Sequence, residues 1–162
     1  MNFISGVYKE SAKTIWNLIQ GWNYFLKHEV VVGITEDANV GRENGMSNAG
    51  LLYMHEQGVP SHNIPPRPVL RPAINDPTTK MQIETLMKDA ARAALVEGKH
   101  DVCAQNFERA GMIGRDACKR WISDGGHLAP NAPATIEKKG SSKPLVDTGS
   151  MLGSITYAVR KK

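Results

Sequence analysis

The sequence predicts an α+β fold, in which a small sheet pairs an early strand with a late strand and packs against a long helical hairpin. Short runs rich in β-branched residues lie at 30–35 and 154–159. Between them, apolar residues recur with the spacing of amphipathic helices. A further amphipathic helix precedes the first run. We therefore expect residues 1–28 to form an N-terminal amphipathic helix and residues 29–162 a single α+β domain.

Size and composition permit one domain with a modest core. The chain has 162 residues, of which 41% are hydrophobic and 22% charged, and this balance argues against extensive disorder. A formal net charge of +4 permits an acidic or nucleic-acid partner without requiring one. The sequence lacks a run of about 18 apolar residues and the layout of a signal peptide, so we expect a soluble chain made in the cytosol.

The N-terminal helix is expected over about 7–27 and carries an apolar stripe. The stripe residues follow an i, i+4, i+7, i+11 spacing and have a tryptophan beside them: Ile15, Ile19, Trp22, Leu26 and the flanking Trp16. Such a stripe usually belongs to the core. At a chain end it can instead pack on another subunit, which makes Trp16 and Trp22 interface candidates.

The next elements are a strand and a short helix. Val30–Thr35 is a β-branched run that ends at Glu36 and Asp37. Ser47–Gln57 can form a short helix, and Gly58 provides its C-terminal stop.

Ile64–Pro72 holds four prolines in nine residues. Each proline fixes its own φ and favours extended geometry in the residue before it, so this segment, the strap, is expected to be neither helix nor free coil. A stiff strap can hold side chains at set positions on a surface, here Arg67, Val69, Leu70 and Arg71. That suits docking against a neighbouring protein. The alternative is a polyproline loop that only joins two elements.

A helical hairpin is expected after the strap. Asp76 and Pro77 have the composition of a helix start, and the first helix closes near Gly98. The second helix starts near Asp101 and has a 4-3-4-3-4 face: Cys103, Phe107, Ala110, Gly114, Ala117 and Trp121. The small residues of this face allow a partner helix to approach closely. Cys103 and Cys118 would lie about 22 Å apart on one helix, beyond disulfide reach, and are expected to be reduced core residues.

The C-terminal part is expected to contain a helical turn near 135–139, a turn at 140–144 and the last strand. In that strand, Ile155, Tyr157 and Val159 alternate and should share one face.

Residues that could carry chemistry are poorly placed for it. A zinc-protease helix needs its second histidine four residues after the first, but Val59 stands four residues after His55, and Gly58 and Pro60 break the helix. We therefore predict no catalytic residue, no metal site and no cofactor.

The order of several motifs carries a resemblance to a known family. Val31–Asp37 is followed by Tyr53–Gly58 and the strap, and near the end Lys139–Leu152, with its Pro-Leu-Val-Asp-Thr-Gly segment, runs into Ser154–Val159. From about Val30 to Arg160 this layout resembles the neck and tail-completion proteins of tailed bacteriophages, small virion components between head and tail. The family often has phenylalanine where Val69 stands, and the N-terminal helix has no firm counterpart.

The resemblance implies a non-enzymatic virion protein that is assembled in the host cytoplasm. It implies a homo-oligomeric ring, a hexamer or dodecamer, that joins head to tail around the channel for genomic DNA. The implied partners are the adjoining head–tail adaptor, the tail terminator or tube proteins, and DNA bound non-specifically, without a membrane. Arg67 and Arg71 are then candidates for contacts with a neighbouring subunit or ring. Asp147, Thr148 and Gly149 resemble the family's structural turn before the last strand.

Two alternatives from other classes remain open. The first is a small basic DNA-binding assembly factor that forms no ring, supported by clustered cations such as Lys138 and Lys139. The second is a small hydrolase using His55, Glu56 and His62. Self-association would distinguish the ring protein from the DNA-binding factor. A bound metal ion would distinguish the hydrolase from the other two.

Overall fold

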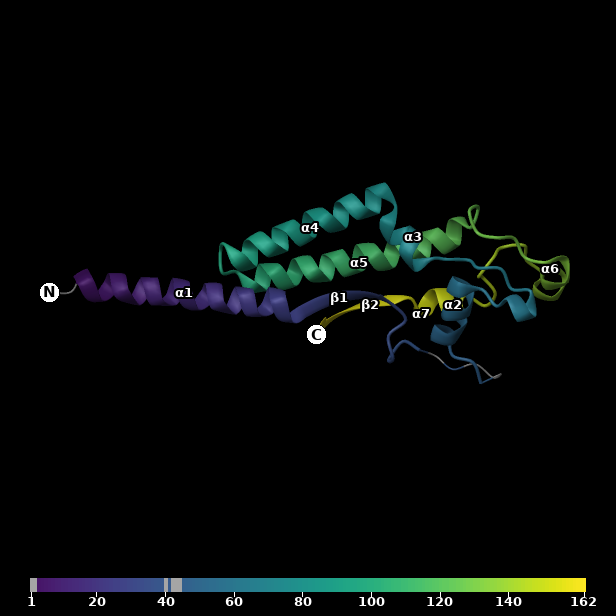
Figure 1. Ribbon diagram of the computed structural model, residues 1–162, viewed down its shortest axis with the longest axis horizontal. Coiled ribbons are helices and arrows are strands. Elements are labelled where there is room, and N and C mark those ends of the chain that lie inside the picture. Colours follow the sequence, from purple (N-terminus) through teal and green to yellow (C-terminus); the bar gives the residue numbers. More distant parts are fainter. Residues whose placement is uncertain (1–2, 40, 42–44) are drawn as a thin grey trace. The chain divides into compact units, whose positions relative to one another are not determined.

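The computed structural model describes residues 3–39, 41 and 45–162 (Figure 1). It confirms the α+β class, with 62% helix and a two-stranded antiparallel sheet packed against a long helical pair. The chain divides into two compact units. Unit 1 comprises Met1–Val31, Met81–Gly111 and Ala158–Lys162, and unit 2 comprises Val32–Lys80 and Met112–Tyr157.

Unit 1 contains the N-terminal helix and one part of the helical hairpin. Helix α1 spans Phe3–Lys27, α4 spans Pro77–Leu95 and α5 spans His100–Asp124, the last two continuing into unit 2. The buried cluster of this unit is built from Ala90, Ala94, Cys103 and Phe107. Tyr24 and Phe25 of α1 pack against this cluster, so the C-terminal end of α1 is anchored through one of its faces.

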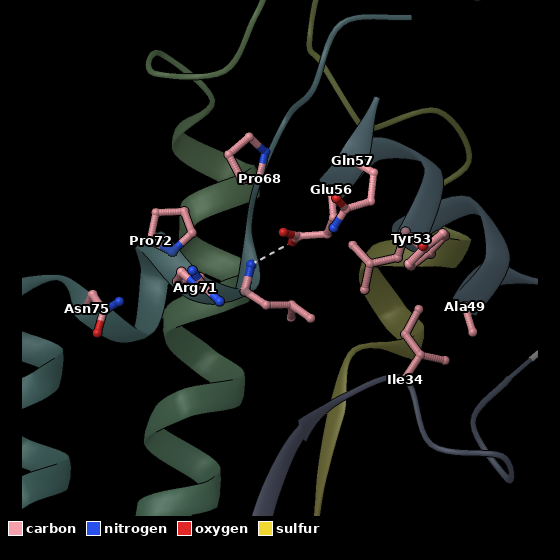
Figure 2. Close-up of a pocket in the computed structure, with 11 residues that line it drawn as sticks. Ile34, Ala49, Tyr53, Glu56, Gln57, Pro68, Arg71, Pro72 and Asn75 are labelled. Carbon is pink, nitrogen blue, oxygen red and sulfur yellow. Dashed lines mark hydrogen bonds between the residues drawn. The ribbon is translucent and has the colours of Figure 1, made fainter. Parts of the chain in front are cut away.

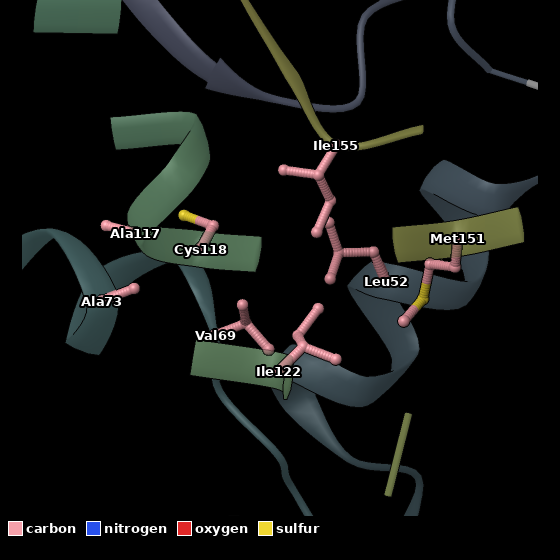
Figure 3. Packing of buried hydrophobic residues seen from close by; sticks show 8 residues of the cluster. All are labelled: Leu52, Val69, Ala73, Ala117, Cys118, Ile122, Met151 and Ile155. Carbon is pink, nitrogen blue, oxygen red and sulfur yellow. The ribbon is translucent and has the colours of Figure 1, made fainter. Parts of the chain in front are cut away.

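Unit 2 contains the short helices and a second core. Its elements are α2 (Asn48–Gln57), the 3-10 turn η1 (Pro60–His62), α3 (Leu70–Asn75), α6 (Pro133–Lys139) and α7 (Ser150–Ser154). Figure 3 shows the buried side chains of this core, which come from α2, α3, α5 and α7, from the residue before α3 and from the residue between α7 and β2: Leu52, Val69, Ala73, Ala117, Cys118, Ile122, Met151 and Ile155. Buried Asn48 also joins α2 to α7, because its Nδ2 donates to Ser154 Oγ at 2.8 Å.

The sheet pairs β1 (His28–Gly33) with β2 (Thr156–Lys161), as the sequence predicts. Of the three residues expected to share one face of the last strand, Tyr157 and Val159 lie in β2, and Ile155 precedes it. Ile155 is fully buried, Val159 packs against the unit 1 cluster, and the Tyr157 ring lies 5.7 Å from the Arg115 guanidinium of α5. The strand starts two residues later than expected because α7 extends to Ser154.

The hairpin helices start where the sequence predicts. Asp76 Oδ2 accepts the Thr79 N–H at 3.1 Å, which caps α4. At Gly114 the close approach expected of a partner helix is made by α3 and by the strand β1. A Cβ at this glycine would meet the side chains of Val32 and Ile74, so the missing side chain admits both elements.

The strap prediction is wrong at its C-terminal end. Within the strap, residues 64–69 form no helix, but α3 begins at Leu70 and includes Arg71 and Pro72. Pro72 is the third residue of α3, where its missing N–H costs nothing because the first N–H groups of a helix have no intrahelical partner.

Candidate interaction surface

The strap is held in place by a carboxylate of α2. Oε1 of Glu56 accepts the backbone N–H groups of both Val69 and Leu70, each at 2.7 Å (Figure 2 labels Glu56). Helix α3 has no side-chain cap from its own N-cap residue, Val69. Glu56 therefore satisfies orphan donors at the α3 N-terminus, where a negative charge is also favoured by the helix dipole.

Arg67 is buried, with 6% of its surface exposed. Its Nε donates to the carbonyl of Ala129 at 2.6 Å, and its Nη2 donates to the carbonyl of Pro130 at 2.7 Å. Burial lowers the pKa of the guanidinium. The side chain thus ties the strap to the loop after α5 through two of its donors. We therefore take Arg67 out of the proposed interface.

Val69 is also an interior residue. Its side chain is fully buried in the unit 2 core, so it anchors the strap to that core and offers no surface to a partner. The strap is also bound to α5, because Trp121 Nε1 donates to the carbonyl of Pro68 at 3.2 Å. Val69 leaves the proposed interface for the same reason as Arg67.

Leu70 and Arg71 lie at a groove between α2, the strap and α3, which we call the strap groove (Figure 2). The groove has a volume of about 890 Å³. Its lining is largely apolar: Ile34, Ala49, Leu52, Tyr53, Glu56, Gln57, Pro68, Leu70, Arg71, Pro72 and Asn75. Tyr53 is 68% exposed, and Arg71 is exposed at the same groove. A surface with an exposed aromatic ring beside an arginine has the composition of protein–protein contact sites.

A second exposed apolar surface lies on α1. The α1 stripe consists of Ile15, Ile19, Trp22 and Leu26, which are 58%, 46%, 51% and 58% exposed, with Trp16 beside it at 60%. The expectation that most such stripes are core is wrong for this helix. The α1 face that packs inside unit 1 is a different one, where Gly21 lies against the backbone of Ala94. Because their side chains are about half exposed, Trp16 and Trp22 remain interface candidates.

The turn at 147–149 has the geometry expected of a structural turn. Gly149 precedes α7 with φ 81°, a conformation that favours glycine. Thr148 Oγ1 accepts the Ser150 N–H at 3.3 Å, whereas Asp147 is exposed. The N-cap position of α7 is Gly149, without a side-chain cap, so neither Asp147 nor Thr148 is the N-cap residue, and Thr148 bonds only to the N–H of the first helical residue.

The two cysteines lie in surroundings that keep a thiol protonated, and the described residues form no metal site. Burial raises the pKa of the Cys103 thiol to about 11. It raises that of Cys118 to about 12, with a further contribution from the charge of Glu56. Both thiols are free and buried. Among the described residues, no three His, Cys, Asp or Glu side chains group together in a way that would hold a metal ion.

Comparisons of the chain with family models, with curated proteins and with solved structures gave no match. In the part of the chain that the structure describes, no helix is long and apolar enough to cross a membrane.

Sequence reasoning missed Glu56 and Tyr53 as residues of the strap groove. Glu56 was considered only beside His55 as part of a metal motif, because its backbone partners lie 13 and 14 residues further along the chain. The available signal for Tyr53 was its aromatic ring in a short helix of polar and apolar residues next to the strap.

Proposed function

We propose that this protein is a structural virion component that forms a ring in the neck of a tailed bacteriophage and joins the head to the tail. In this proposal the ring surrounds the DNA channel, and the chain acts by binding its neighbours and not by catalysing a reaction. The order of the sequence motifs from Val30 to Arg160 is the source of the proposal.

The observation that carries it in the structure is the strap groove. Its walls are held by buried anchors, Arg67 and Val69, and by the two hydrogen bonds to Glu56, so they are set before any partner arrives. Preorganised surfaces lose little conformational entropy on binding. Tyr53, Leu70 and Arg71 remain available at the groove, and we assign to them the contact with the adjoining subunit or ring.

Complementation of a phage that lacks this protein tests the proposal. The wild-type chain should restore infectious particles, and immunoelectron microscopy of those particles should label the junction of head and tail. Tyr53→Asp and Arg71→Glu should each reduce the yield at least about tenfold, because each places a negative charge at the apolar contact surface.

The matched control is Thr78→Asp, which adds the same charge as Tyr53→Asp at an exposed position in the first turn of α4. It should leave the yield unchanged. Absence of the chain from purified particles, or labelling away from the neck, would sink the proposal.

A further inference from the structure

The α1 stripe is an apolar surface that the proposed strap contact does not use. We propose that the α1 stripe is a self-association surface, on which α1 of one copy packs against α1 of a second copy of the chain. This inference does not depend on the neck function, because it concerns only how the chain meets itself.

The spacing of the stripe suits a helix as its occupant. Successive stripe residues are separated by four, three and four positions, so they form one continuous apolar face along about three turns of α1. A second α1 carries the same face, and two such faces can pack side by side.

The charges of α1 permit a second copy at the stripe. From residue 10 onward, the charged positions Glu10, Lys13 and Lys27 lie at least about 100° around the helix from the centre of the stripe, at 100° per residue. The residues on its exposed flank, Trp16 and Asn23, are neutral. Coiled coils that select a different partner usually do so with charges beside the seam. Without such charges, a second α1 meets no like-charge repulsion.

The exposed area of the stripe fits a small interface. A buried aromatic side chain covers about 150–250 Å², so the two half-exposed tryptophans contribute roughly 200 Å² per copy. Two copies would bury roughly 400 Å² through the tryptophans, and the three aliphatic side chains add to this area, which places the contact among the small, weak interfaces.

The α1 stripe is also held in place by contacts with α4 inside unit 1. Trp22 Nε1 donates to the carbonyl of Leu95 at 3.2 Å while half of the side chain stays exposed. The close approach of Gly21 to Ala94 positions the same turn of α1. Because the Trp22 indole is already held in place before two copies meet, their pairing costs less side-chain entropy.

Sedimentation equilibrium of the full chain over a concentration series tests the inference. The wild-type chain should self-associate, and Ile15→Glu or Ile19→Glu should raise the dissociation constant at least about tenfold. The control is Thr14→Glu, which places the same charge on the same helix about 110° from the stripe centre, at an exposed position. It should associate like the wild type.

Cysteine cross-linking gives a second readout that does not need destabilising charges. The native thiols are buried and have raised pKa values, so a new cysteine on α1 is the reactive one. Under mild oxidation, Ile19→Cys mixed with Ile15→Cys should form covalent dimers, and Thr14→Cys should form far fewer.

Two results would overturn the inference. One is a wild-type chain that stays monomeric up to about 100 μM. The other is an oligomer whose mass is the same in both glutamate variants, with Thr14→Cys cross-linking as well as the stripe positions. In that second case the neck proposal would stand, because a ring could still form through the strap groove. Failure of the complementation experiment would leave the α1 result untouched.

Discussion

The carboxylate of Glu56 accepts the backbone N–H of Leu70 at 2.7 Å, although the two residues are 14 positions apart. This bond starts helix α3 and ends the extended part of the strap. It joins α2 to the strap and, with the parallel bond to Val69, sets the walls of the strap groove.

Replacing Glu56 should therefore destabilise unit 2. Glu56→Ala leaves two backbone donors without their acceptor, and we expect the free energy of unfolding to fall by about 1–3 kcal/mol. Urea denaturation followed by circular dichroism measures the change. Glu137→Ala, which removes an exposed carboxylate on α6, should change the stability by less than about 0.5 kcal/mol. Equal effects of the two substitutions would contradict the assigned role.

The two strap arginines should respond differently to substitution. Arg67→Ala removes the donors to two carbonyls and leaves a cavity, so we expect a loss of about 2–4 kcal/mol in the free energy of unfolding. Arg67→Lys should recover only part of this, because one ammonium cannot reproduce the fork geometry. Arg71→Ala should cost less than about 0.5 kcal/mol, since Arg71 is exposed. Similar melting temperatures for Arg67→Ala and Arg71→Ala would refute this division.

The contact between Gly21 and Ala94 should make α1 intolerant of a side chain at this position. A methyl group at Gly21 meets the backbone of Ala94, which cannot move aside as a flexible side chain can. Gly21→Ala should therefore destabilise the fold by about 1–3 kcal/mol, despite the higher helix propensity of alanine.

The control for this prediction is Gly153→Ala in α7, where a Cβ would meet no atom within 4 Å. Thermal unfolding of this variant should show an unchanged or slightly higher melting temperature. A stabilised Gly21→Ala variant would show that α1 does not pack through this face.

The buried cysteines should make stability fall at alkaline pH. Their pKa values in the folded chain are about 11 and about 12, against 9.0 for an unperturbed thiol. Below pH 9 both states hold the thiol proton. Above it the unfolded state loses the proton first, so folding stability declines through the window up to the folded pKa values. The two thiols together should contribute a loss of about 1–3 kcal/mol by pH 10.

Denaturation curves at pH 8 and pH 10 measure this decline. Tyrosines and lysines also titrate in this range, so the comparison is with the Cys103→Ala, Cys118→Ala double variant. The double variant should lose less stability between the two pH values than the wild type. An identical decline in both proteins would show that the thiols ionise as easily in the folded state as in the unfolded one.

Local signals in the sequence were enough to predict the longer helices, the two strands and their pairing. Ser47 and Gly58 bound α2, and Asp76 and Pro77 start α4, because caps and helix breakers act over a few residues.

Features that depend on distant residues were not predicted. The first turn of α3 needs Glu56, and the burial of Arg67 needs the carbonyls of Ala129 and Pro130, 62 and 63 positions away. The exposure of the α1 stripe depends on which helix face meets α4, and Gly21 decides that by admitting the backbone of Ala94. A hydrophobic pattern identifies an apolar face but does not say whether the same chain covers it.

The mass of the purified chain in solution, alone and then mixed with the proteins encoded beside it, tests the central claim most directly. The account predicts a hexamer or dodecamer, either for the chain alone or on mixing. A chain that remains a monomer or dimer in both conditions, and changes its mass only when DNA is added, would contradict the ring and favour a DNA-binding assembly factor.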